Sequence, residues 1–436
     1  MGAERVISTE GKTPPSEYFR HEGGKLLAER VPLERIASDH GTPTYVYSGS
    51  AVDAAYRRID SALEGVPHFI AYAMKANSNL SVLRRLHQLG AGADIVSGGE
   101  LARALRAGFT GDRIVFSGVG KTDPEIRAAL EADVRAIHVE STQEIDAVEG
   151  IAKALGRVAR IALRVNPNVD AATHPYISTG LRTSKFGVSL EHAAALLPRL
   201  TSSPSLRLEG LASHVGSMVG SPGPIAESVE IVAGFARECR AKGAPITTID
   251  AGGGWPITYG DEQTEAASST EFGKAITSAL KRGGGEGFSL SVEPGRYIVG
   301  DAGVLLTRVV FVKEQYGKRF VIVDAAMTEL IRPALYGAYH AIVPVEAAPS
   351  GAPLTPADVV GPVCESSDFL AKDRKLPPLE RGDLLAVRGA GAYAAAMGST
   401  YNSRPLATEV IVEGDRVSVA RRRQPIESLW DLEPLE

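Results

Sequence analysis

The sequence predicts an α/β protein, made of a (β/α)8 barrel of the TIM type followed by a mostly β C-terminal domain. Eight apolar, strand-like runs alternate with helical patterns over the first two thirds of the chain. This alternation is typical of a parallel barrel. After about residue 300, strand-like runs follow one another without long helical patterns between them. A doubly wound open sheet is the alternative for the first region, because it shows the same local pattern.

The predicted barrel strands are short apolar runs, and stretches rich in Ala, Leu, Arg and Glu separate them. We place the barrel over residues 49–300. A helix over about 51–63 precedes the first strand. The strands lie near 69–74, 94–96, 114–117, 136–139, 160–166, 207–214, 247–251 and 289–293. The helices between them include 80–89, 99–107, 124–132, 142–155, 190–200 and 225–242.

The β domain is predicted over residues 301–436. Turns are expected at Arg381-Gly382-Asp383 and Glu413-Gly414-Asp415. Residues 1 to about 25 are polar, so we expect a loosely held lead-in. Within the N-terminal segment 1–48, the stretch 33–47 begins as a helix and ends as a strand that we expect to join the β domain. The other predicted strands lie at 304–312, 319–323, 384–387, 408–412 and 416–420.

Composition excludes several classes of protein. The 436 residues are 44% hydrophobic and 23% charged, with a net charge of −5, which is typical of a soluble globular protein and does not favour nucleic-acid binding. The sequence contains no apolar run long enough to cross a membrane, and the N-terminus lacks the pattern of a secretory signal. Two cysteines make no disulfide framework, so we expect a cytoplasmic protein. No metal-ligand spacing occurs, and we predict no metal site.

A lysine closes the first predicted strand, in the stretch Tyr72-Ala73-Met74-Lys75-Ala76-Asn77. If the strand continues to its end, Ala71, Ala73 and Lys75 share one face. The two alanines leave room beside the amine for a large ligand. A lysine in a partly dry pocket loses preference for its charged form, and its amine can then form a Schiff base with a carbonyl. The alternative is a strand-end lysine whose ammonium extends into water.

Other predicted strand ends also carry polar residues or glycines, at the end of a barrel where active sites form. Glu293 can hold a proton on a heteroaromatic nitrogen, although an ion pair with Arg296 is the alternative. His214 offers a flat ring, although a hydrogen-bonded core histidine is equally expected. These strand ends are Arg164-Val165-Asn166-Pro167, His214-Val215-Gly216-Ser217, Gly252-Gly253-Gly254 and Glu293-Pro294-Gly295-Arg296.

The three glycines and Ser217 are suited to a phosphate group. Glycines let backbone N–H groups approach an anion closely, and the Ser217 hydroxyl adds a donor. A flexible turn is the alternative for such a glycine run. Taken together, an amine, a flat ring, a phosphate nest and a carboxylate match the needs of pyridoxal 5'-phosphate.

The predicted β domain adds three further motifs. An acidic, serine-rich segment is typical of a loop, so we expect Cys364 to be exposed. The alternative for a lone cysteine is an inert buried thiol. The three motifs are Arg332-Pro333-Ala334-Leu335-Tyr336-Gly337, Cys364-Glu365-Ser366-Ser367-Asp368 and Gly391-Ala392-Tyr393.

These motifs, in this order, resemble the diaminopimelate decarboxylases, a family in the alanine-racemase-like barrel class (fold type III) of pyridoxal phosphate enzymes. The resemblance covers about residues 25–430 and includes Thr179-Gly180-Leu181-Arg182-Thr183-Ser184-Lys185-Phe186-Gly187. It implies a barrel with a β domain and a homodimer that shares its active sites. It also implies decarboxylation of meso-2,6-diaminopimelate at its D-configured centre to L-lysine and CO2, the last step of lysine biosynthesis.

The resemblance also implies roles for individual residues. Lys75 carries the cofactor and Cys364 returns a proton, and Cys364 and Glu365 reach the site from the other subunit. The implied cofactor contacts, besides Lys75, are His214, Ser217, Gly252, Gly253, Gly254, Glu293, Pro294, Gly295, Arg296 and Tyr393. The implied substrate contacts are Arg296, Arg332, Tyr336, Glu365 and Tyr393.

The sequence departs from the family directly after the triple glycine. Residues 255–259 read Trp-Pro-Ile-Thr-Tyr where the family usually has a leucine and another glycine, and 260–269 also diverge. This departure concerns the conformation of the loop beside the phosphate rather than the phosphate site itself.

Three other functions fit parts of the pattern. The first is a decarboxylase of ornithine, lysine, arginine or a carboxylated polyamine, which needs an anionic site for a distal ammonium. Arg332 with Arg296 suits a distal carboxylate, and Glu365 suits a distal ammonium, so together they favour a substrate with both groups at its far end. Non-catalytic pyridoxal phosphate carriers are usually small single barrels, and the β domain with Cys364 argues against that class. A racemase is disfavoured because no clear second acid–base tyrosine is present.

Overall fold

The computed structural model describes residues 17–170, 185–260 and 267–435 of the chain. These residues form two compact units: one contains 53–170, 185–256 and 267–297, and the other contains 17–52, 257–260 and 298–435. Most of the family-like motif at 179–187 lies outside the described residues, as do residues 261–266 of the divergent loop.

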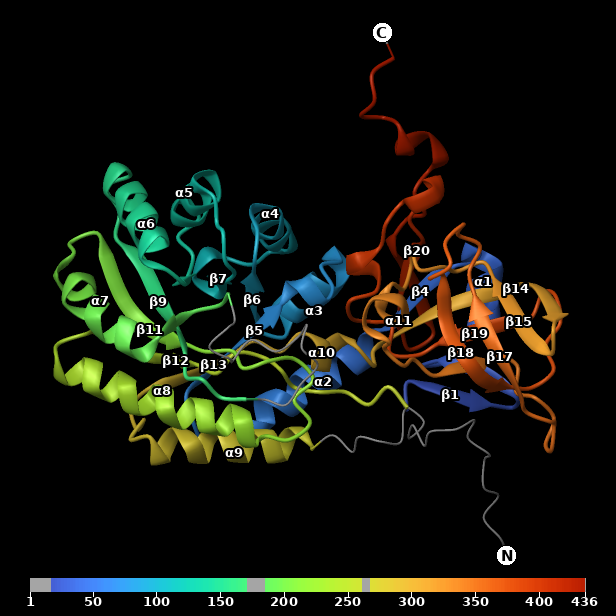
Figure 1. Cartoon of the computed structure of the whole chain (residues 1–436), viewed down its shortest axis with the longest axis horizontal. Coiled ribbons are helices and arrows are strands. Elements are labelled where there is room, and N and C mark those ends of the chain that lie inside the picture. Colours follow the sequence, from blue (N-terminus) through green and yellow to red (C-terminus); the bar gives the residue numbers. More distant parts are fainter. Residues whose placement is uncertain (1–16, 171–184, 261–266, 436) are drawn as a thin grey trace, which may run out of the picture. The chain divides into compact units, whose positions relative to one another are not determined.

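The first unit is a closed barrel of eight parallel strands (Figure 1). Its strands follow the sheet order β9-β11-β12-β13-β5-β6-β7-β8, and β8 pairs with β9 to close the sheet. This closure confirms the predicted TIM-type barrel and rules out the open doubly wound sheet. The strands are β5 (His68–Ala73), β6 (Gly92–Ile95), β7 (Ile114–Phe116), β8 (Ala136–Val139), β9 (Ala159–Asn166), β11 (Leu206–Ala212), β12 (Thr248–Asp250) and β13 (Ser289–Val292).

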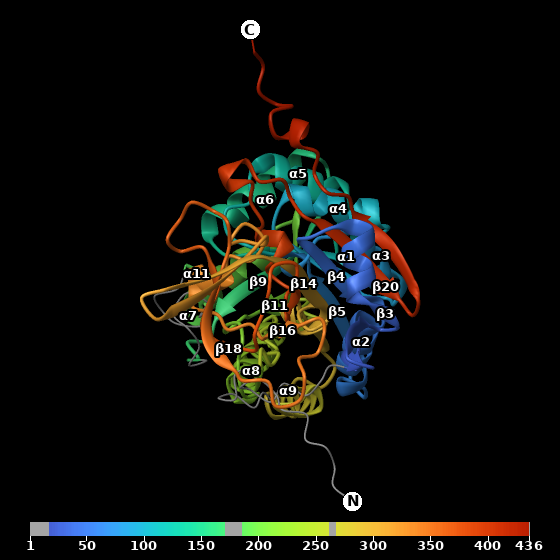
Figure 2. The same ribbon diagram turned by 90° about the vertical axis from the view of Figure 1, so that its right-hand side faces the viewer.

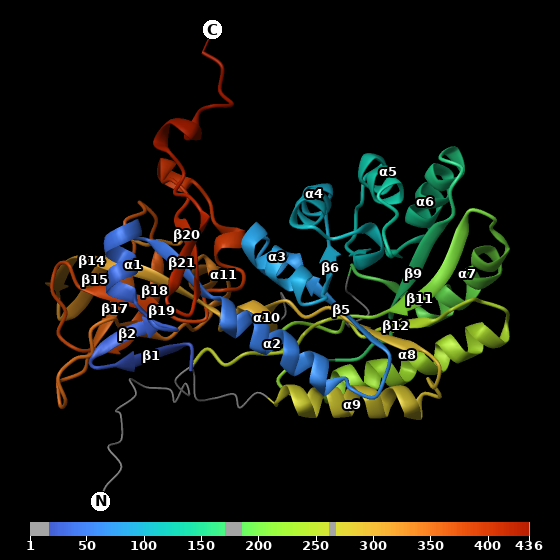
Figure 3. The same cartoon turned by 180° about the vertical axis from the view of Figure 1, so that it is seen from behind.

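Helices surround these strands, and several begin at a serine cap. The side chains of Ser97, Ser141 and Ser189 each accept a hydrogen bond from the backbone N–H three residues on, which satisfies a donor that the helix itself cannot pair. α8 and α9 run side by side along the barrel (Figures 1 and 3). The helices are α2 (Gly49–Ala62), α3 (Leu80–Gln88), α4 (Gly98–Ala107), α5 (Asp123–Glu131), α6 (Thr142–Ala154), α7 (Leu190–Ser202), α8 (Gly223–Ala241), α9 (Ser269–Arg282) and α10 (Arg296–Val299).

The second unit is built on a large mixed sheet in the order β18-β17-β15-β14-β4-β20-β21. β4 pairs antiparallel with β14 and parallel with β20 (Figure 2), so Val46 lies opposite Val304 on one side and Val410 on the other. These valines are part of one buried core cluster. The strands are β4 (Thr44–Ser48), β14 (Gly303–Gln315), β15 (Lys318–Val323), β16 (Ile342–Pro344), β17 (Thr355–Val360), β18 (Phe369–Leu376), β19 (Leu384–Val387), β20 (Thr408–Glu413) and β21 (Arg416–Arg421).

A small antiparallel sheet and a helix complete this unit at the N-terminal side. The sheet contains β1 (Phe19–Glu22), β2 (Lys25–Ala28) and β3 (Val31–Pro32), and the helix is α1 (Leu33–His40). Phe19 and Leu26 are buried in the core cluster. The prediction of a loose lead-in up to about residue 25 is therefore wrong from residue 19 onward, because two apolar side chains in a polar stretch reach the core.

Besides β1, β2 and β3, three further strands of the second unit were not predicted. β17 contains a proline, β16 is short, and β18 (FLAKDRKL) carries four charged residues among its eight. Their apolar runs are too broken to predict strands, and pairing with neighbours in the sheet supplies what the local pattern lacks. Among the described residues, none of the helices is both long and apolar enough to cross a membrane.

Candidate active site

Lys75 lies directly after β5, in a single 3₁₀ turn over Met74–Ala76. Its Nζ lies 3.2 Å from Oδ2 of Asp94, whose side chain is fully buried on β6. About 40% of the Lys75 side chain is exposed. The strand ends at Ala73, so the predicted continuation of one strand face to Lys75 is wrong. The turn instead leaves the amine at the carboxyl end of the barrel, paired with a buried carboxylate and still accessible.

The segment after β13 packs against this turn. The backbone N–H of Ala73 donates to the carbonyl of Pro294 at 3.1 Å. A Cβ atom at Gly295 would lie 3.0 Å from Cβ of Ala76 and 3.1 Å from Cβ of Ala73. Gly295 therefore lets the Glu293–Arg296 segment lie against the Lys75 turn.

Glu293 is buried and belongs to a network inside the barrel. Its Oε1 accepts a hydrogen bond from Ser117 Oγ at 3.2 Å, and Ser117 Oγ lies 3.1 Å from Nδ1 of His138. His138 Nδ1 is itself 3.5 Å from Glu293 Oε1, and its Nε2 is 4.0 Å from Oδ2 of Asp250. Ser117 thus joins Glu293 and His138, and the His138 ring lies between the carboxyl groups of Glu293 and Asp250.

Burial sets the protonation of this network. It raises the pKa of Glu293 well above the usual range of a glutamate, and the negative charges of Asp250 and Asp94 raise it further. Burial also raises the pKa of Asp250 and lowers that of His138. Ionisation of Glu293 and Asp250 is therefore unfavourable unless a cation lies beside them or they share a proton with a neighbour.

The same three side chains are close enough to share a metal ion. One ligand atom each from His138, Asp250 and Glu293 lies within 4.8 Å of the others. No spacing in the sequence indicates this cluster, because its residues come from β8, from β12 and from the loop after β13 and meet only when the barrel closes. Ser117 already connects His138 with Glu293 by hydrogen bonds, so we interpret the cluster as one that shares protons.

The predicted phosphate nest is a tight turn beside His214. Gly252 and Gly254 have φ of +66° and +97°, in the left-handed region that favours glycine. At Gly253 the constraint is space, because a Cβ atom there would lie 2.4 Å from the carbonyl oxygen of Glu293. No side chain fits at this central position, so only glycine allows this turn.

His214 is fixed by the same turn. The N–H of Gly253 donates to its Nδ1 at 3.0 Å, so the proton of the neutral ring is on Nε2. Burial, together with the positive charges of Arg164 and Lys75, lowers the pKa of His214 well below its usual range. The ring therefore stays neutral and keeps a fixed orientation.

Two arginines of the barrel have defined partners. Arg296 donates from Nη2 to Ser217 Oγ at 3.1 Å, which joins two predicted site residues. Arg164 pairs with the buried Glu140 at 3.0 Å and lies 4.6 Å from the centroid of the Phe186 ring. Phe186 belongs to the described end of the motif at 179–187.

In the second unit, Arg332 is buried at the start of α11 (Arg332–Tyr336). Its Nη1 lies 2.7 Å from Nε2 of His340, and its guanidinium carbon lies 4.5 Å from the centroid of the Tyr259 ring. Tyr336, at the other end of the same helix, is half-buried.

Cys364 and Glu365 lie in the segment between β17 and β18, and both are exposed, as expected for Cys364. The N–H of Cys364 donates to Asn402 Oδ1 at 2.9 Å, and Asp368 Oδ2 accepts from the N–H of Val363 at 2.7 Å. The other cysteine, Cys239, is buried, and burial raises its pKa to about 11.

Tyr393 has a φ of +55°, which is costly for a residue with a side chain. It follows Gly391, where a Cβ atom would collide with the carbonyl of Val299.

Sequence reasoning missed the interior of the barrel site. Asp94, Ser117, His138 and Asp250 were not singled out, although Asp94 and His138 are polar residues inside apolar strands. That pattern is a usable signal, because a polar side chain inside a parallel strand must find a partner in the barrel. His340 and Tyr259 gave no comparable signal.

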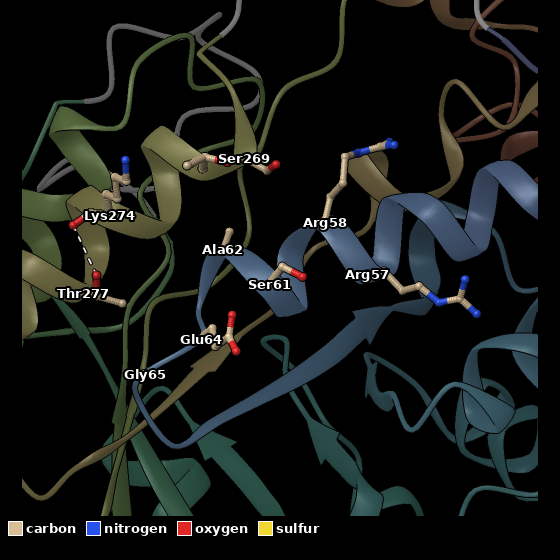
Figure 4. Close-up of a pocket in the computed structure, with 10 residues that line it drawn as sticks. Arg57, Arg58, Ser61, Ala62, Glu64, Gly65, Ser269, Lys274 and Thr277 are labelled. Carbon is tan, nitrogen blue, oxygen red and sulfur yellow. Dashed lines mark hydrogen bonds between the residues drawn. The ribbon is translucent and has the colours of Figure 1, made fainter.

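A separate surface hollow of about 600 Å³ lies between α2 and α9 (Figure 4). Among the residues that the structure describes, its lining includes none of the predicted site residues. Figure 4 shows the side chains of Arg57 and Arg58 extending away from Lys274, so these cations do not converge on one point. We assign no ligand to this hollow.

Comparisons with known proteins agree with this geometry. A family model described as the pyridoxal binding domain of pyridoxal-dependent decarboxylases matches residues 50–300. Diaminopimelate decarboxylase of Pseudomonas aeruginosa is 47% identical over 422 residues, which cover 96% of this chain and 99% of that protein. The chain belongs to the diaminopimelate decarboxylase family.

Solved members of the diaminopimelate decarboxylase family share the fold. The M. jannaschii enzyme in complex with L-lysine has a TM-score of 0.91 at 33% identity, and the match covers 96% of this chain and 98% of that one. The Helicobacter pylori enzyme, also complexed with L-lysine, has a TM-score of 0.87 at 44% identity, with 92% and 99% covered. Pyridoxal phosphate is the cofactor of this family, as the sequence predicted.

Proposed function

We propose that this protein removes CO2 from the D-configured centre of meso-2,6-diaminopimelate and yields L-lysine, the last step of lysine biosynthesis, with pyridoxal 5'-phosphate as cofactor. One observation carries the proposal. In a chain of this family, the Lys75 amine is accessible at the carboxyl end of β5 and is paired with the buried Asp94.

The barrel residues fit the cofactor. Lys75 would attach it, and the nest of Gly252, Gly253 and Gly254 with Ser217 would hold its phosphate. His214 would lie along the ring as a neutral, fixed partner, and Glu293 would hold a proton on the ring nitrogen. Pro294, Gly295 and Arg296 would line the same side, and Tyr393 of the β domain would complete the site. The turn of the nest requires glycine, because Cβ atoms at its three positions would lie too close to neighbouring protein atoms.

When bound, pyridoxal phosphate accepts the electron pair that CO2 leaves behind. The chain's own residues prepare for this. Because burial and two nearby carboxylates raise the pKa of Glu293, its anion is stabilised most by a positively charged partner such as a protonated ring nitrogen. Ser117 donates to Oε1 of Glu293 and fixes its direction.

The β domain supplies the groups for the far end of the substrate. Arg332, with Arg296, would bind the distal carboxylate, and Glu365 would bind the distal ammonium, with Tyr336 and Tyr393 beside them. Cys364 would return a proton to the carbon that lost CO2. We propose that Cys364 and Glu365 act on the site of the other subunit, so that the protein works as a homodimer.

The organisation of the chain belongs to the same proposal. We propose a pyridoxal phosphate-binding barrel over 49–300, supported by the family match over 50–300, a β domain over 301–436 and an N-terminal segment over 1–48 that contributes to the β domain. We further propose a cytoplasmic location, which an exposed free thiol at Cys364 favours.

The test is to incubate the holoenzyme separately with meso-diaminopimelate, lysine, ornithine and arginine and to measure CO2. A site with a buried guanidinium rejects an analogue that lacks its partner by roughly 10⁴-fold. We expect rapid release from meso-diaminopimelate and release lower by about that factor from the other three. Comparable turnover of lysine or ornithine would instead support a diamine-forming decarboxylase.

A further inference from the structure

We propose that His340 and Tyr259 are positioning residues for Arg332, and that they set the preference of the site for a substrate with a distal carboxylate. This inference rests on the proposed function, in which Arg332 binds that carboxylate. Neither residue belongs to the set predicted from the sequence.

His340 fixes the direction of the Arg332 guanidinium. The ring has no exposed surface, and its Nδ1 lies 2.8 Å from the carbonyl oxygen of Arg388. A guanidinium only donates, so Nε2 of His340 must accept from Arg332 Nη1, and the ring proton must be on Nδ1, where it donates to Arg388. Both ring nitrogens are engaged, so the ring cannot rotate without losing a buried hydrogen bond.

The same guanidinium lies over the ring of Tyr259. The guanidinium carbon of Arg332 lies 4.5 Å from the centre of the Tyr259 ring. The rings of Tyr259 and His340 are 4.9 Å apart and meet edge to face at 69°. The donors of a guanidinium form one rigid plane. The hydrogen bond at Nη1 and the contact with the Tyr259 ring therefore restrict the direction of the whole guanidinium.

The backbone around Tyr259 is fitted to this position. The N–H of Ala341 donates to the carbonyl of Tyr259 at 3.3 Å, next to His340 in the chain. Gly389 has a φ of +66°, and a Cβ atom there would lie 2.8 Å from Cδ1 of Tyr259. A glycine at 389 thus makes room for the Tyr259 ring.

Tyr259 lies close in sequence to the phosphate nest and contacts the proposed substrate-binding residue Arg332. It follows Gly254, the last glycine of the phosphate nest, by five residues, in the segment where the sequence departs from the family pattern. Residues 257–260 nevertheless pack with the β-domain unit that contains Arg332. The segment that follows the phosphate nest therefore supplies the Tyr259 ring, over which the guanidinium of Arg332 lies.

The alternative is that this aromatic cluster only fills the core. A core-filling role predicts that removing a ring lowers thermal stability and weakens all ligands of the site alike. A positioning role predicts a selective loss for ligands with the carboxylate. L-lysine and cadaverine separate the two, because cadaverine is lysine without its carboxylate.

The experiment measures the affinity of the holoenzyme for L-lysine and for cadaverine, and KM and kcat for meso-diaminopimelate. We expect Tyr259→Leu and His340→Leu each to weaken L-lysine binding and to raise KM about tenfold, since the lost contacts are a buried cation–π pair and a charged hydrogen bond. Cadaverine affinity and kcat should change by less than about threefold. Tyr259→Phe, which keeps the ring, should behave like wild type. Phe311→Leu is the matched control, because it removes an exposed aromatic contact of Arg381 in the same unit.

The outcomes separate this inference from the proposed function. If wild type shows no preference for L-lysine over cadaverine and Arg332→Ala changes nothing, the assignment of Arg332 itself fails. If Arg332→Ala abolishes the preference but both leucine variants keep it, or weaken both ligands equally, only the positioning roles fail.

A second measurement observes the His340 ring in the wild-type protein directly. In ¹⁵N NMR of wild-type protein with labelled histidine, His340 should show the neutral tautomer with the proton on Nδ1, assigned by its loss in His340→Gln. A ring protonated on Nε2, or on both nitrogens, would overturn the proposed bond from Arg332.

Discussion

The carboxyl group of Glu293 is buried beside Asp250 and Asp94, so both the loss of water and the repulsion of two anions disfavour its charge. Lys75 and Arg164 offset part of this cost. A glutamate with a raised pKa binds more protons in the folded chain than in the unfolded chain. The stability of the cofactor-free protein therefore falls as pH rises from the unfolded pKa of a glutamate towards the folded one.

Glu293→Gln should accordingly stabilise the cofactor-free protein, with a gain that grows with pH. Each pH unit between the two pKa values adds up to about 1.4 kcal/mol. Thermal unfolding at pH 5 and pH 8 tests this: the melting temperature should rise clearly at pH 8 and little at pH 5. The exposed Glu286→Gln is the control and should change neither value. An equal shift at both pH values would mean that the pKa of Glu293 is not raised in the folded protein.

At the scale of elements, the turn after β12 joins the phosphate nest to Glu293. A Cβ atom at Gly253 would lie 2.4 Å from the carbonyl oxygen of Glu293 and 3.6 Å from Cε1 of His214. The close neighbour is backbone, which cannot move aside as a flexible side chain would. The turn therefore packs directly against both His214 and the backbone of Glu293.

Gly253→Ala should move this turn and weaken the binding of pyridoxal phosphate. Overpacking costs about 1–3 kcal/mol, so we expect the dissociation constant of the cofactor to rise about tenfold or more, together with a lower melting temperature. Gly150→Ala is the control, because a Cβ atom at that helical position meets nothing within 4 Å. That change should stabilise the protein by roughly 0.5–1 kcal/mol and leave cofactor binding unchanged. Unchanged cofactor affinity in Gly253→Ala would argue against the nest.

The elements of the barrel could be predicted because each strand is a short apolar run between helical patterns. Lys75, His214 and Glu293 lie one or two residues after a strand end, close to where the sequence predicted them. The 3₁₀ turn at Lys75 could not be predicted, since nothing in the apolar run marks the end of the strand at Ala73.

The contacts between these residues were not predictable from spacing. His138 meets Asp250 and Glu293 only after the barrel closes, and Tyr259 meets Arg332 only because residues 257–260 pack with the β-domain unit. Local sequence patterns do not predict such long-range contacts.

At the scale of the whole molecule, the proposed dimer explains why Cys364 and Glu365 are exposed in a single chain. Cys364 and Glu365 are neighbours in the chain, and both are exposed. Across a two-fold interface, each subunit would complete the site of its partner.

Mixing inactive Lys75→Ala chains with inactive Cys364→Ala chains should then restore activity. A hybrid dimer contains one site with both residues intact, so random exchange should give about a quarter of wild-type activity. Differently tagged chains show by co-purification whether the subunits exchange. If they exchange and no activity returns, both residues act within one chain.

The most direct test of the central claim is to find which lysine holds the cofactor. The holoenzyme is reduced with borohydride, digested, and the labelled peptide is sequenced by mass spectrometry. We predict a single label on Lys75, and none in Lys75→Ala. Lys121 is the internal comparison, because its side chain is only 1% exposed and its amine is already hydrogen-bonded to Gly118, His138 and Glu144. A label on Lys121 or any other lysine, or a label that persists in Lys75→Ala, would contradict the account.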